Sequence, residues 1–440
     1  MRTNTVFLTI ISVMALLFAC KNANNTEQSS TLQTNSIPVD LSGKNVGWRE
    51  DNRTGVSSET GLLKSWPEGG PALVWSTTEL SDGYSSVAIG NNTIYITGYD
   101  KQNDNDVLIA LDNLGKILWQ TSYGRSWNGS NPETRCTPTV DSNRVYVTSG
   151  LGDVACVDAN SGKMLWQSKA SETYQGTCGN WGISESIIVF GDQIYYSPGG
   201  PQTMTIALNK FTGDLIWKSP SLNDKAAYVS PILIDYAGKK ILVNVSLAHV
   251  YAIDVSNGEM LWSVAIPSEA KWGDHIVCVT PLYKDGMIYA TEGYNSGGLM
   301  VKMADDGNNA QLVWTDQVLD VHHGGVVLID GYIYGSNWTS NGNGDWCCID
   351  WKTGKTMYEQ HWENKGSIIA ADGMLYIYEE KSGNVGLVKP DPSKFDLVSS
   401  FKVPLGSGPY WAHPVIHNGY LYLRHGKALM VYDIRTTTQG

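Results

Sequence analysis

A turn followed by a short apolar strand that ends in tryptophan recurs along most of this 440-residue chain. In DANSGKMLWQS, residues 158–168, the turn formers Asp158 and Asn160 precede Gly162, which adopts a positive φ at little steric cost. The apolar run that follows ends at Trp166. Equivalent aromatic anchors lie at Trp75, Trp119, Trp217, Trp262, Trp314 and Tyr358. Their spacing of roughly 40 to 50 residues predicts a propeller or a solenoid.

Each repeat contains the signals of four strands. CTPTVDSN, RVYVTSG, DVACVDANSG and KMLWQSK alternate in polarity and are separated by Gly, Asn and Asp, which predicts one antiparallel blade. Eight such units begin, but the last has only three strands and ends near Ile434, whereas PALVWSTTEL around Trp75 is a strand without a blade. We therefore predict an all-β, eight-bladed β-propeller of four-stranded antiparallel blades, the last closed by the N-terminal strand. We expect the recurrent Trp to pack between blades.

The D-x-x-[TSN]-G-x-x-x-W repeats resemble the PQQ-like, or quinoprotein-type, β-propeller repeat over about four fifths of the chain. WGISESIIVFGDQIYYSPGG, HHGGVVLIDGYIYG and HPVIHNGYLYLR are similar to stretches of bacterial PQQ-like repeat proteins. The segment that begins GWREDNRTG also carries this resemblance, but Glu50 and Asp51 stand where the family pattern would have Gly-Pro. In architecture the chain also resembles the eight-bladed outer-membrane assembly scaffold lipoprotein.

The first 45 residues indicate an envelope lipoprotein. Arg2 precedes a mainly apolar run of about 14 residues, which is short for a membrane span. Leu17-Phe18-Ala19-Cys20 resembles a bacterial lipobox, and the resemblance implies cleavage before Cys20 and lipidation there. We therefore predict a signal peptide over 1–19, a lipidated Cys20 with a flexible tether over 20–45, and the propeller over 46–440. The expected location is the cell envelope, at the outer membrane, with the lipid as the only membrane contact.

The composition of the chain limits which macromolecules it can bind and which disulfides it can form. The formal net charge of −12 argues against nucleic acid as a partner. Six cysteines follow Cys20, and their pairing is not determined by the sequence. Cys347 and Cys348 are adjacent, as in the vicinal disulfide of PQQ-dependent dehydrogenases, but they fall in a predicted third strand, away from the axis. Burial is the expected role of Cys156 and Cys348.

Candidate ligand-binding residues follow from the fold, because the first strand of each blade lines the central channel. Aligning the blades at the residue before the recurrent Pro places a ring of side chains two positions earlier, which faces the same way. That ring is Tyr84, Arg135, Ser184, Tyr228, Cys278, His323, Lys365 and Trp411. The aligned position forms a collar of Ser86, Thr137, Ser186, Ser230, Thr280, Gly325, Ser367 and His413, with Trp181, Glu185, His322 and Tyr410 nearby.

This constellation suits a polar ligand such as an acidic carbohydrate. Arg135 and Lys365 would bind a carboxylate or sulfate, and the aromatic faces would take sugar rings. Glu185 with His322 or His323 offers an acid and a base. We predict no metal site, because adjacent residues of a strand, such as His322 and His323, point to opposite faces.

Two functions stay open from the sequence. The first is a membrane-anchored, non-catalytic propeller that binds a polar ligand or an envelope protein partner at the channel mouth and needs no cofactor. The alternative is a PQQ-dependent, calcium-containing or other oxidoreductase that acts on an alcohol or a sugar. No clear set of calcium-ligating Glu, Asn and Asp is found beside an Arg in a matching motif. The fold alone does not decide between these functions.

Overall fold

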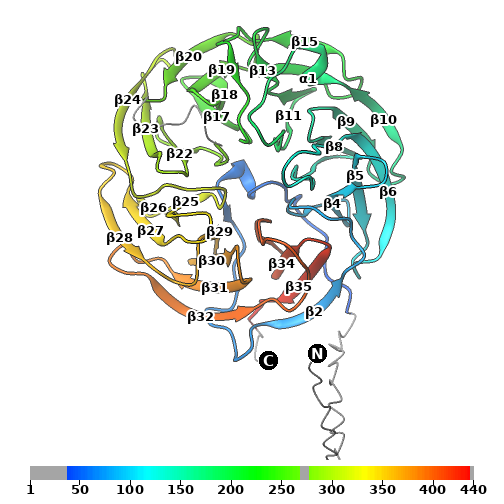
Figure 1. The fold of residues 1–440 in the computed structure, drawn as a ribbon, viewed down its shortest axis with the longest axis vertical. Coiled ribbons are helices and arrows are strands. Elements are labelled where there is room, and N and C mark those ends of the chain that lie inside the picture. The colour runs from blue at the N-terminus through cyan, green and yellow to red at the C-terminus, as the bar shows by residue number, and fades with distance from the viewer. Residues whose placement is uncertain (1–36, 268–276, 437–440) are drawn as a thin grey trace, which may run out of the picture. The chain divides into compact units, whose positions relative to one another are not determined.

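The structure, a computed structural model, describes residues 37–267 and 277–436. In this part of the chain, eight sheets of four antiparallel strands follow one another around a ring (Figure 1). The predicted eight-bladed all-β propeller is therefore confirmed. The described helical elements are two single turns, η1 (Asp51–Arg53) and α1 (Ala170–Thr173).

The blades follow the chain in order. Blade 1 consists of β3 (Ala88–Gly90), β4 (Thr93–Asp100), β5 (Asn105–Leu111) and β6 (Ile117–Arg125), and blade 2 of β7 (Thr139–Asp141), β8 (Arg144–Thr148), β9 (Val154–Asp158) and β10 (Met164–Ser168). Blade 3 consists of β11 (Ile188–Phe190), β12 (Gln193–Tyr196), β14 (Ile206–Asn209) and β15 (Leu215–Lys218). Blade 4 consists of β17 (Ile232–Tyr236), β18 (Lys239–Val245), β19 (His249–Asp254) and β20 (Met260–Ala265). A small extra sheet joins β13 (Gly199–Gly200) to β16 (Asp224–Lys225).

Blade 5 consists of β21 (Leu282–Lys284), β22 (Met287–Glu292), β23 (Gly297–Met303) and β24 (Ala310–Asp316). Blade 6 consists of β25 (Val326–Ile329), β26 (Tyr332–Ser336), β27 (Trp346–Asp350) and β28 (Thr356–Gln360). Blade 7 consists of β29 (Gly366–Ala371), β30 (Met374–Glu379), β31 (Asn384–Lys389) and β32 (Asp396–Lys402). A two-residue strand, β1 (Val56–Ser57), adds to blade 7 in parallel with β29.

Blade 8 is shared by the two ends of the described chain. Its inner strands are β33 (Val415–His417), β34 (Tyr420–His425) and β35 (Ala428–Asp433), and its outer strand is β2 (Ala72–Thr77), which pairs with β35. Figure 1 shows blue β2 beside red β35. The predicted closure is confirmed, and it leaves no unpaired edge on β35.

The repeated turn and tryptophan join neighbouring blades. In every blade the pairing of the third and fourth strands carries a register shift, as between Leu73 and Trp75 or Met164 and Trp166. Such a bulge re-aims the side chain that follows it. At five junctions the Trp ring lies on the turn glycine of the next blade: Trp75 on Gly115, Trp119 on Gly162, Trp166 on Gly213, Trp217 on Gly258 and Trp314 on Gly354.

Only glycine fits beneath these rings. A Cβ on Gly258 would stand 2.6 Å from the Trp217 ring, and its φ of +79° already disfavours other residues. The Trp217 indole also donates a hydrogen bond to Val255 O at 3.1 Å. The contact between Trp75 and Gly115 joins blade 8 to blade 1, so the same device closes the ring.

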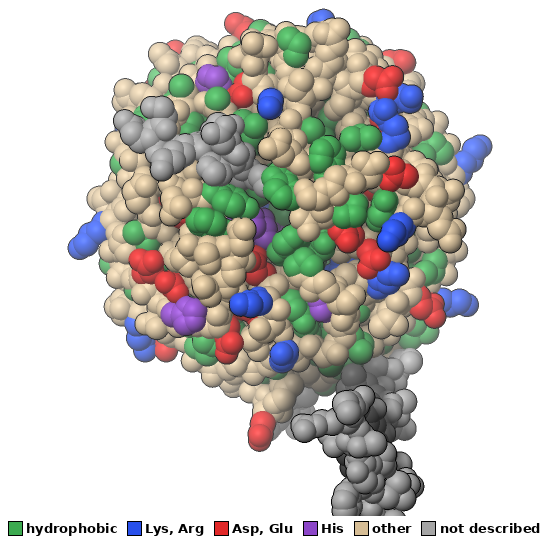
Figure 2. Space-filling view, in the orientation of Figure 1, with side chains coloured by type: hydrophobic (Ala, Val, Ile, Leu, Met, Phe, Trp, Pro, Cys, Tyr) green, Lys and Arg blue, Asp and Glu red, His purple; other side chains and the backbone are tan. Residues whose placement is uncertain are grey.

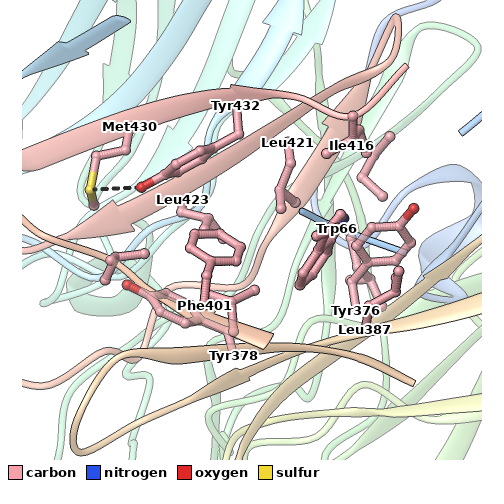
Figure 3. Packing of buried hydrophobic residues seen from close by; sticks show 14 of the residues in the cluster. Trp66, Tyr376, Tyr378, Leu387, Phe401, Ile416, Leu421, Leu423, Met430 and Tyr432 are labelled. Carbon is pink, nitrogen blue, oxygen red and sulfur yellow. Dashed lines mark hydrogen bonds between the residues drawn. The ribbon is translucent and has the colours of Figure 1, made fainter. Parts of the chain in front are cut away.

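The hydrophobic core lies between the blades. The second and third strands are almost fully buried, as in β30, whereas outer strands such as β10 are only partly buried. Figure 3 shows the contact between blades 7 and 8, where Trp66 meets Phe401 edge-on with ring centroids 5.2 Å apart. Tyr432 donates to the sulfur of Met430 at 3.7 Å in the same cluster.

Residues 45–53, which we call the axial segment, fill the middle of the ring and hydrogen-bond to all eight blades (Figure 1). The bonds at blades 1 to 5 are Val46 N to Ile89 O (2.9 Å), Asn45 Nδ2 to Val140 O (3.3 Å), Arg53 to Ile187 O (2.8 Å) and Pro231 O (2.9 Å), and Trp48 Nε1 to Thr280 Oγ1 (2.9 Å). At blades 6 to 8, Arg49 binds Val326 O, Ile368 O (3.1 Å) and His413 Nδ1 (3.0 Å).

The axial segment has an unusual backbone. Arg49, Glu50, Asn52 and Arg53 all have φ between 52° and 63°, a left-handed region that costs about 1–2 kcal/mol for each such residue. Glu50 therefore stands where glycine would be unstrained, as the family pattern suggests. Burial raises the pKa of the Glu50 carboxyl to about 8. The hydrogen bonds to the blades offset these costs.

The predicted tether ends before residue 45. Val39 and Leu41 are buried in the core beside blades 1 and 8, and Val39 N donates to Asn113 O at 3.0 Å. Two apolar residues in a polar stretch explain why composition alone placed this boundary too late. The predicted signal peptide, Cys20 and residues 21–36 lie outside the described residues. Among those described, no helix is both long and apolar enough to cross a membrane.

The cysteines of the described residues form no disulfide. Cys156 and Cys348 are fully buried in β9 and β27, as expected. Cys347 precedes Cys348 in the third strand of blade 6, also buried.

Candidate functional site

One mouth of the ring holds a cavity of about 310 Å³, which we call the mouth cavity. Most of its lining comes from the segments that lead into the first strands of blades 1 to 6 and of blade 8. The lining residues are Trp48, Tyr84, Asn131, Arg135, Trp181, Ser184, Tyr228, Ser230, Cys278, Tyr294, His322, His323, Asn341, Glu380, Trp411 and His413. On the face drawn in Figure 2, hydrophobic side chains gather around the middle of the ring, with a histidine among them.

Eight of the ten predicted ligand-binding residues line this cavity: Tyr84, Arg135, Trp181, Tyr228, His322, His323, Trp411 and His413. They come together because each precedes an inner strand, so the pseudo-symmetry of the ring brings them to one level. Whether they bind a ligand stays a prediction.

Aromatic rings form much of the wall. Trp411 packs against Tyr84 at 4.8 Å between centroids and meets the His323 ring edge-on at 5.2 Å. Trp48, from the axial segment, packs on His413 at 4.7 Å. These contacts hold the rings in place before any ligand arrives, which lowers the entropic cost of binding.

Arg135 supplies a positive charge to the wall. Its guanidinium lies 5.4 Å from the centre of the Tyr228 ring and donates to Asn131 O. The Tyr228 hydroxyl in turn donates to Trp181 O. Arg135 thus stacks on a ring that is itself fixed, which leaves donors of its planar fork for an anion.

His322, His323 and Glu380 form a compact polar cluster. One ring nitrogen of each histidine and one oxygen of Glu380 all lie within 4.8 Å of one another. Burial pushes the pKa of Glu380 upward, but His323 and Lys365 outweigh it and hold that pKa at about 2. Burial, together with the neighbouring His323, lowers the pKa of His322 well below its usual value. The cluster therefore holds an ionised carboxylate and a neutral imidazole at neutral pH.

The prediction that His322 and His323 point to opposite faces of a strand, and so cannot share a metal ion, is wrong. Residues 321–325 precede β25 and are not in a strand, so their side chains do not alternate between faces. Gly325, with φ of +74°, follows the pair, and the rings of His322 and His323 lie 4.3 Å apart. The expectation that these histidines point apart is corrected.

Lys365 and Glu185 do not line the cavity. Lys365 is buried behind the wall, where its ammonium lies 2.7 Å from Glu380 Oε1 and donates to Ser340 O at 2.9 Å. Its charge is compensated there, so the prediction that Arg135 and Lys365 together bind an anion is corrected: Arg135 lines the cavity and Lys365 does not.

Glu185 faces the core. Its neighbour Ser184 lines the cavity, whereas the Glu185 carboxyl accepts a hydrogen bond from Ser197 N at 3.2 Å. Burial raises the pKa of Glu185 to about 8, although Arg53 lowers it in part. It is not an acid or base of the mouth cavity.

The predicted collar lies mostly beneath the cavity and is used for contacts between blades. Ser186 N donates to Ser230 Oγ at 2.9 Å, and Ser86 N donates to Thr137 Oγ1 at 3.1 Å. His413 accepts from Arg49 and donates to His323 O at 2.9 Å. Burial, then the charge of Arg49, lowers the pKa of His413 well below its usual value, so His413 is a neutral structural link.

Sequence reasoning missed five of the lining residues: Trp48, Asn131, Tyr294, Asn341 and Glu380. Tyr294 and Glu380 belong to loops between the second and third strands of blades 5 and 7, whereas the alignment covered only entries to first strands. Tyr410, placed nearby, instead stacks on His425 at 3.6 Å. The conspicuous GWREDNR stretch was the one available signal for Trp48.

The comparisons with known proteins agree with this fold. The family described as outer membrane protein assembly factor BamB matches residues 103–360, more than half of the chain. BamB of Yersinia pestis is 22% identical over 354 residues, which are 74% of this chain and 82% of that protein.

Solved structures agree as well. BamB from Moraxella catarrhalis superposes with a TM-score of 0.60 at 14% identity and covers 82% of this chain and 99% of its own. Quinohemoprotein alcohol dehydrogenase from Comamonas testosteroni does so with a TM-score of 0.62 at 13% identity, over 88% of this chain and 80% of its own. At these identities the structural likeness shows the fold alone. By its match over residues 103–360, the chain belongs to the PQQ-like propeller family described as outer membrane protein assembly factor BamB.

Proposed function

We propose that this chain is a non-catalytic envelope propeller that binds a small polar ligand, with a ring and one acidic group, in the mouth cavity. The observation that carries the proposal is a cavity of about 310 Å³ whose wall combines fixed aromatic rings with Arg135. Apolar walls with few convergent polar groups are typical of small-molecule sites. An acidic sugar fits this chemistry, because its ring stacks on an aromatic face and its carboxylate pairs with a guanidinium.

The lipid anchor at Cys20 and the outer-membrane location are part of this proposal. They are supported by the lipobox-like sequence before Cys20 and by relatives named outer membrane assembly factors. Docking of an envelope protein is the second candidate function, and the family match favours it. A protein partner would bind the rims of several blades rather than the mouth cavity alone.

The residues of the mouth cavity do not fit PQQ with calcium. Calcium takes six to eight oxygen ligands, whereas the cavity is lined by a single carboxylate, Glu380, whose Oε1 is already paired with Lys365. The adjacent Cys347 and Cys348 lie buried in β27 and do not line it. This donor set supports a binding function over a quinone-dependent dehydrogenase.

An array of neutral, carboxylated and sulfated saccharides, followed by calorimetry on the full chain, tests the proposal. We expect an acidic ligand whose affinity falls as salt rises, because the guanidinium contact is electrostatic. Arg135→Met keeps most of the side-chain volume and should weaken binding at least about tenfold. Arg435→Met is the matched control, since Arg435 pairs with Asp433 on the surface.

Equal binding by the wild type and Arg135→Met would refute the proposed site. Absence of any saccharide ligand would instead favour protein docking, which pull-down with envelope membranes would then examine.

A further inference from the structure

The polar cluster in the mouth cavity has the ligand types of a transition-metal site. Two imidazoles and a carboxylate are donors that zinc and its neighbours prefer, whereas magnesium and calcium prefer oxygen alone. His323 Nε2 lies 3.1 Å from Glu380 Oε2. Two ligand atoms of a tetrahedral zinc ion are about 3.3 Å apart, given bonds of about 2.0–2.1 Å. This pair therefore already has the separation that one shared ion requires.

His322 has a nitrogen available for the same ion. Its Nε2 lies 2.9 Å from the Tyr294 hydroxyl, and its Nδ1 is buried without a hydrogen-bond partner among the described residues. When Nε2–H donates to Tyr294, Nδ1 carries the lone pair. A metal-bound histidine typically donates its other N–H in this way, which fixes the ring and its tautomer. Nδ1 is thus a buried acceptor that a cation would satisfy.

The surroundings hold the other two groups in place. Lys365 binds Glu380 Oε1 at 2.7 Å and leaves Oε2 for His323. His413 donates to the backbone oxygen of His323 at 2.9 Å and is itself held by Arg49. The positive charge of Lys365 weakens cation binding, but its hydrogen bond orients the carboxylate. One ring nitrogen of each histidine and one oxygen of Glu380 already lie within 4.8 Å of one another, so the three side chains lie close enough to share one ion.

We propose that His322, His323 and Glu380 bind one divalent transition-metal ion, with zinc as the representative metal, at the wall of the mouth cavity. All three residues line the cavity, so the remaining coordination positions open into it. Water or the acidic group of a ligand fills them, as in zinc sites with three protein ligands. The inference goes beyond the proposed saccharide binding and does not depend on it.

Cobalt is the first probe, because its visible absorption reports ligand type and coordination number. The full chain, free of any polyhistidine tag, is titrated with Co²⁺ and then with competing Zn²⁺, with no saccharide present. We expect one Co²⁺ per chain, an absorption spectrum of four or five ligands without thiolate bands, and displacement by Zn²⁺. Saturating Zn²⁺ should also raise the melting temperature, because it binds the folded state.

Variants identify the ligands. His323→Ala and His322→Ala should each weaken Co²⁺ binding at least about tenfold, and Tyr294→Phe, which alters only a positioning residue, about tenfold. Glu380→Gln should have the same effect but leaves Lys365 buried without its partner, so the histidine variants protect the test against a folding defect. His361→Ala is the matched control, because that exposed histidine pairs with Asp345 outside the cavity.

Two results would overturn the inference. One is a wild-type chain that takes up no Co²⁺ or Zn²⁺ at millimolar concentrations. The other is binding that survives both cavity histidine variants, or that shows thiolate bands from a cysteine such as Cys278, which also lines the cavity.

Discussion

At the scale of single residues, the repeat signature is a contact between blades rather than a feature of one blade. Trp217 covers Gly258 of the following blade, and the same pairing closes the ring at Trp75 and Gly115. The sequence predicted a structural role for these rings, since large apolar side chains recur at fixed spacing. It did not predict their targets, because the register shift that turns each ring depends on strand pairing.

Trp217→Ala should reduce the free energy of unfolding by roughly 3–5 kcal/mol, because Trp217 is only 9% exposed and removal of its ring leaves a cavity. Urea denaturation measures this loss. Trp217→Phe, which loses the hydrogen bond to Val255 O but keeps an aromatic ring, should cost less. Similar losses in both variants would contradict a packing role.

Glu185 should make stability depend on pH. Its pKa is about 8 in the folded protein, against an ordinary value of 4.5, so between these pH values only the folded state keeps the proton. Raising the pH across this window therefore favours unfolding. Glu185→Gln removes this effect, and its stability relative to wild type should rise from pH 4.5 to 8 and be level outside that window. Urea titrations at several pH values measure the difference, and a constant difference would be inconsistent with a buried, protonated Glu185.

At the scale of elements, the axial segment stabilises the fold more than its short length suggests, because it hydrogen-bonds to every blade. Arg49 alone reaches blades 6, 7 and 8 and is only 4% exposed. Burial lowers its pKa to about 10, so it stays charged at neutral pH.

Arg49→Lys should reduce the free energy of unfolding by roughly 2–4 kcal/mol, because a single ammonium cannot reproduce the planar fork of hydrogen bonds. Chemical denaturation provides the measurement. Arg435→Lys, at an exposed ion pair with Asp433, should cost less than about 1 kcal/mol. Comparable losses in the two variants would show that the axial segment adds little.

The outer strand of blade 8 should be indispensable. Deleting residues 72–77 removes β2 and exposes β35 as an open edge, so we expect aggregation or a lower melting temperature. Deleting residues 37–45 should also destabilise the protein, because Val39 and Leu41 are buried. Deleting residues 21–36 should leave the melting temperature unchanged. Three equal melting curves would be incompatible with closure by β2.

At the scale of the whole molecule, the features that could be predicted from the sequence are those that repeat with the symmetry of the ring. Blade number, closure and nine of the residues that line the mouth cavity follow from a repeat that places equivalent residues at one level. Lys365 and Glu185 were misplaced because alignment gives a residue's level but not the partner its side chain finds. Glu380 and Trp48 lie outside the repeated strand pattern, so no periodicity identifies them.

Unfolding should be a single cooperative transition, in contrast to open repeat arrays, whose units lose structure separately. Every blade contacts its two neighbours and the axial segment. Loss of one blade therefore removes contacts from both neighbours and from the segment that binds all the other blades. Tryptophan fluorescence and far-ultraviolet circular dichroism should therefore give coincident urea curves. Separate midpoints in the wild type would be evidence against this coupling.

The position of the axial segment in the chain has a consequence for biosynthesis. Residues 45–53 leave the ribosome before any blade, so each blade meets an existing hydrogen-bonding partner as it forms. Val46 and Asn45 engage blades 1 and 2, Arg53 engages blades 3 and 4, and Trp48 engages blade 5. Arg49 lacks its acceptors until blades 6 to 8 have been translated. In a nascent chain stalled after blade 5, water would thus solvate the Arg49 guanidinium, so the axial segment completes its bonds only when the last blade has been translated.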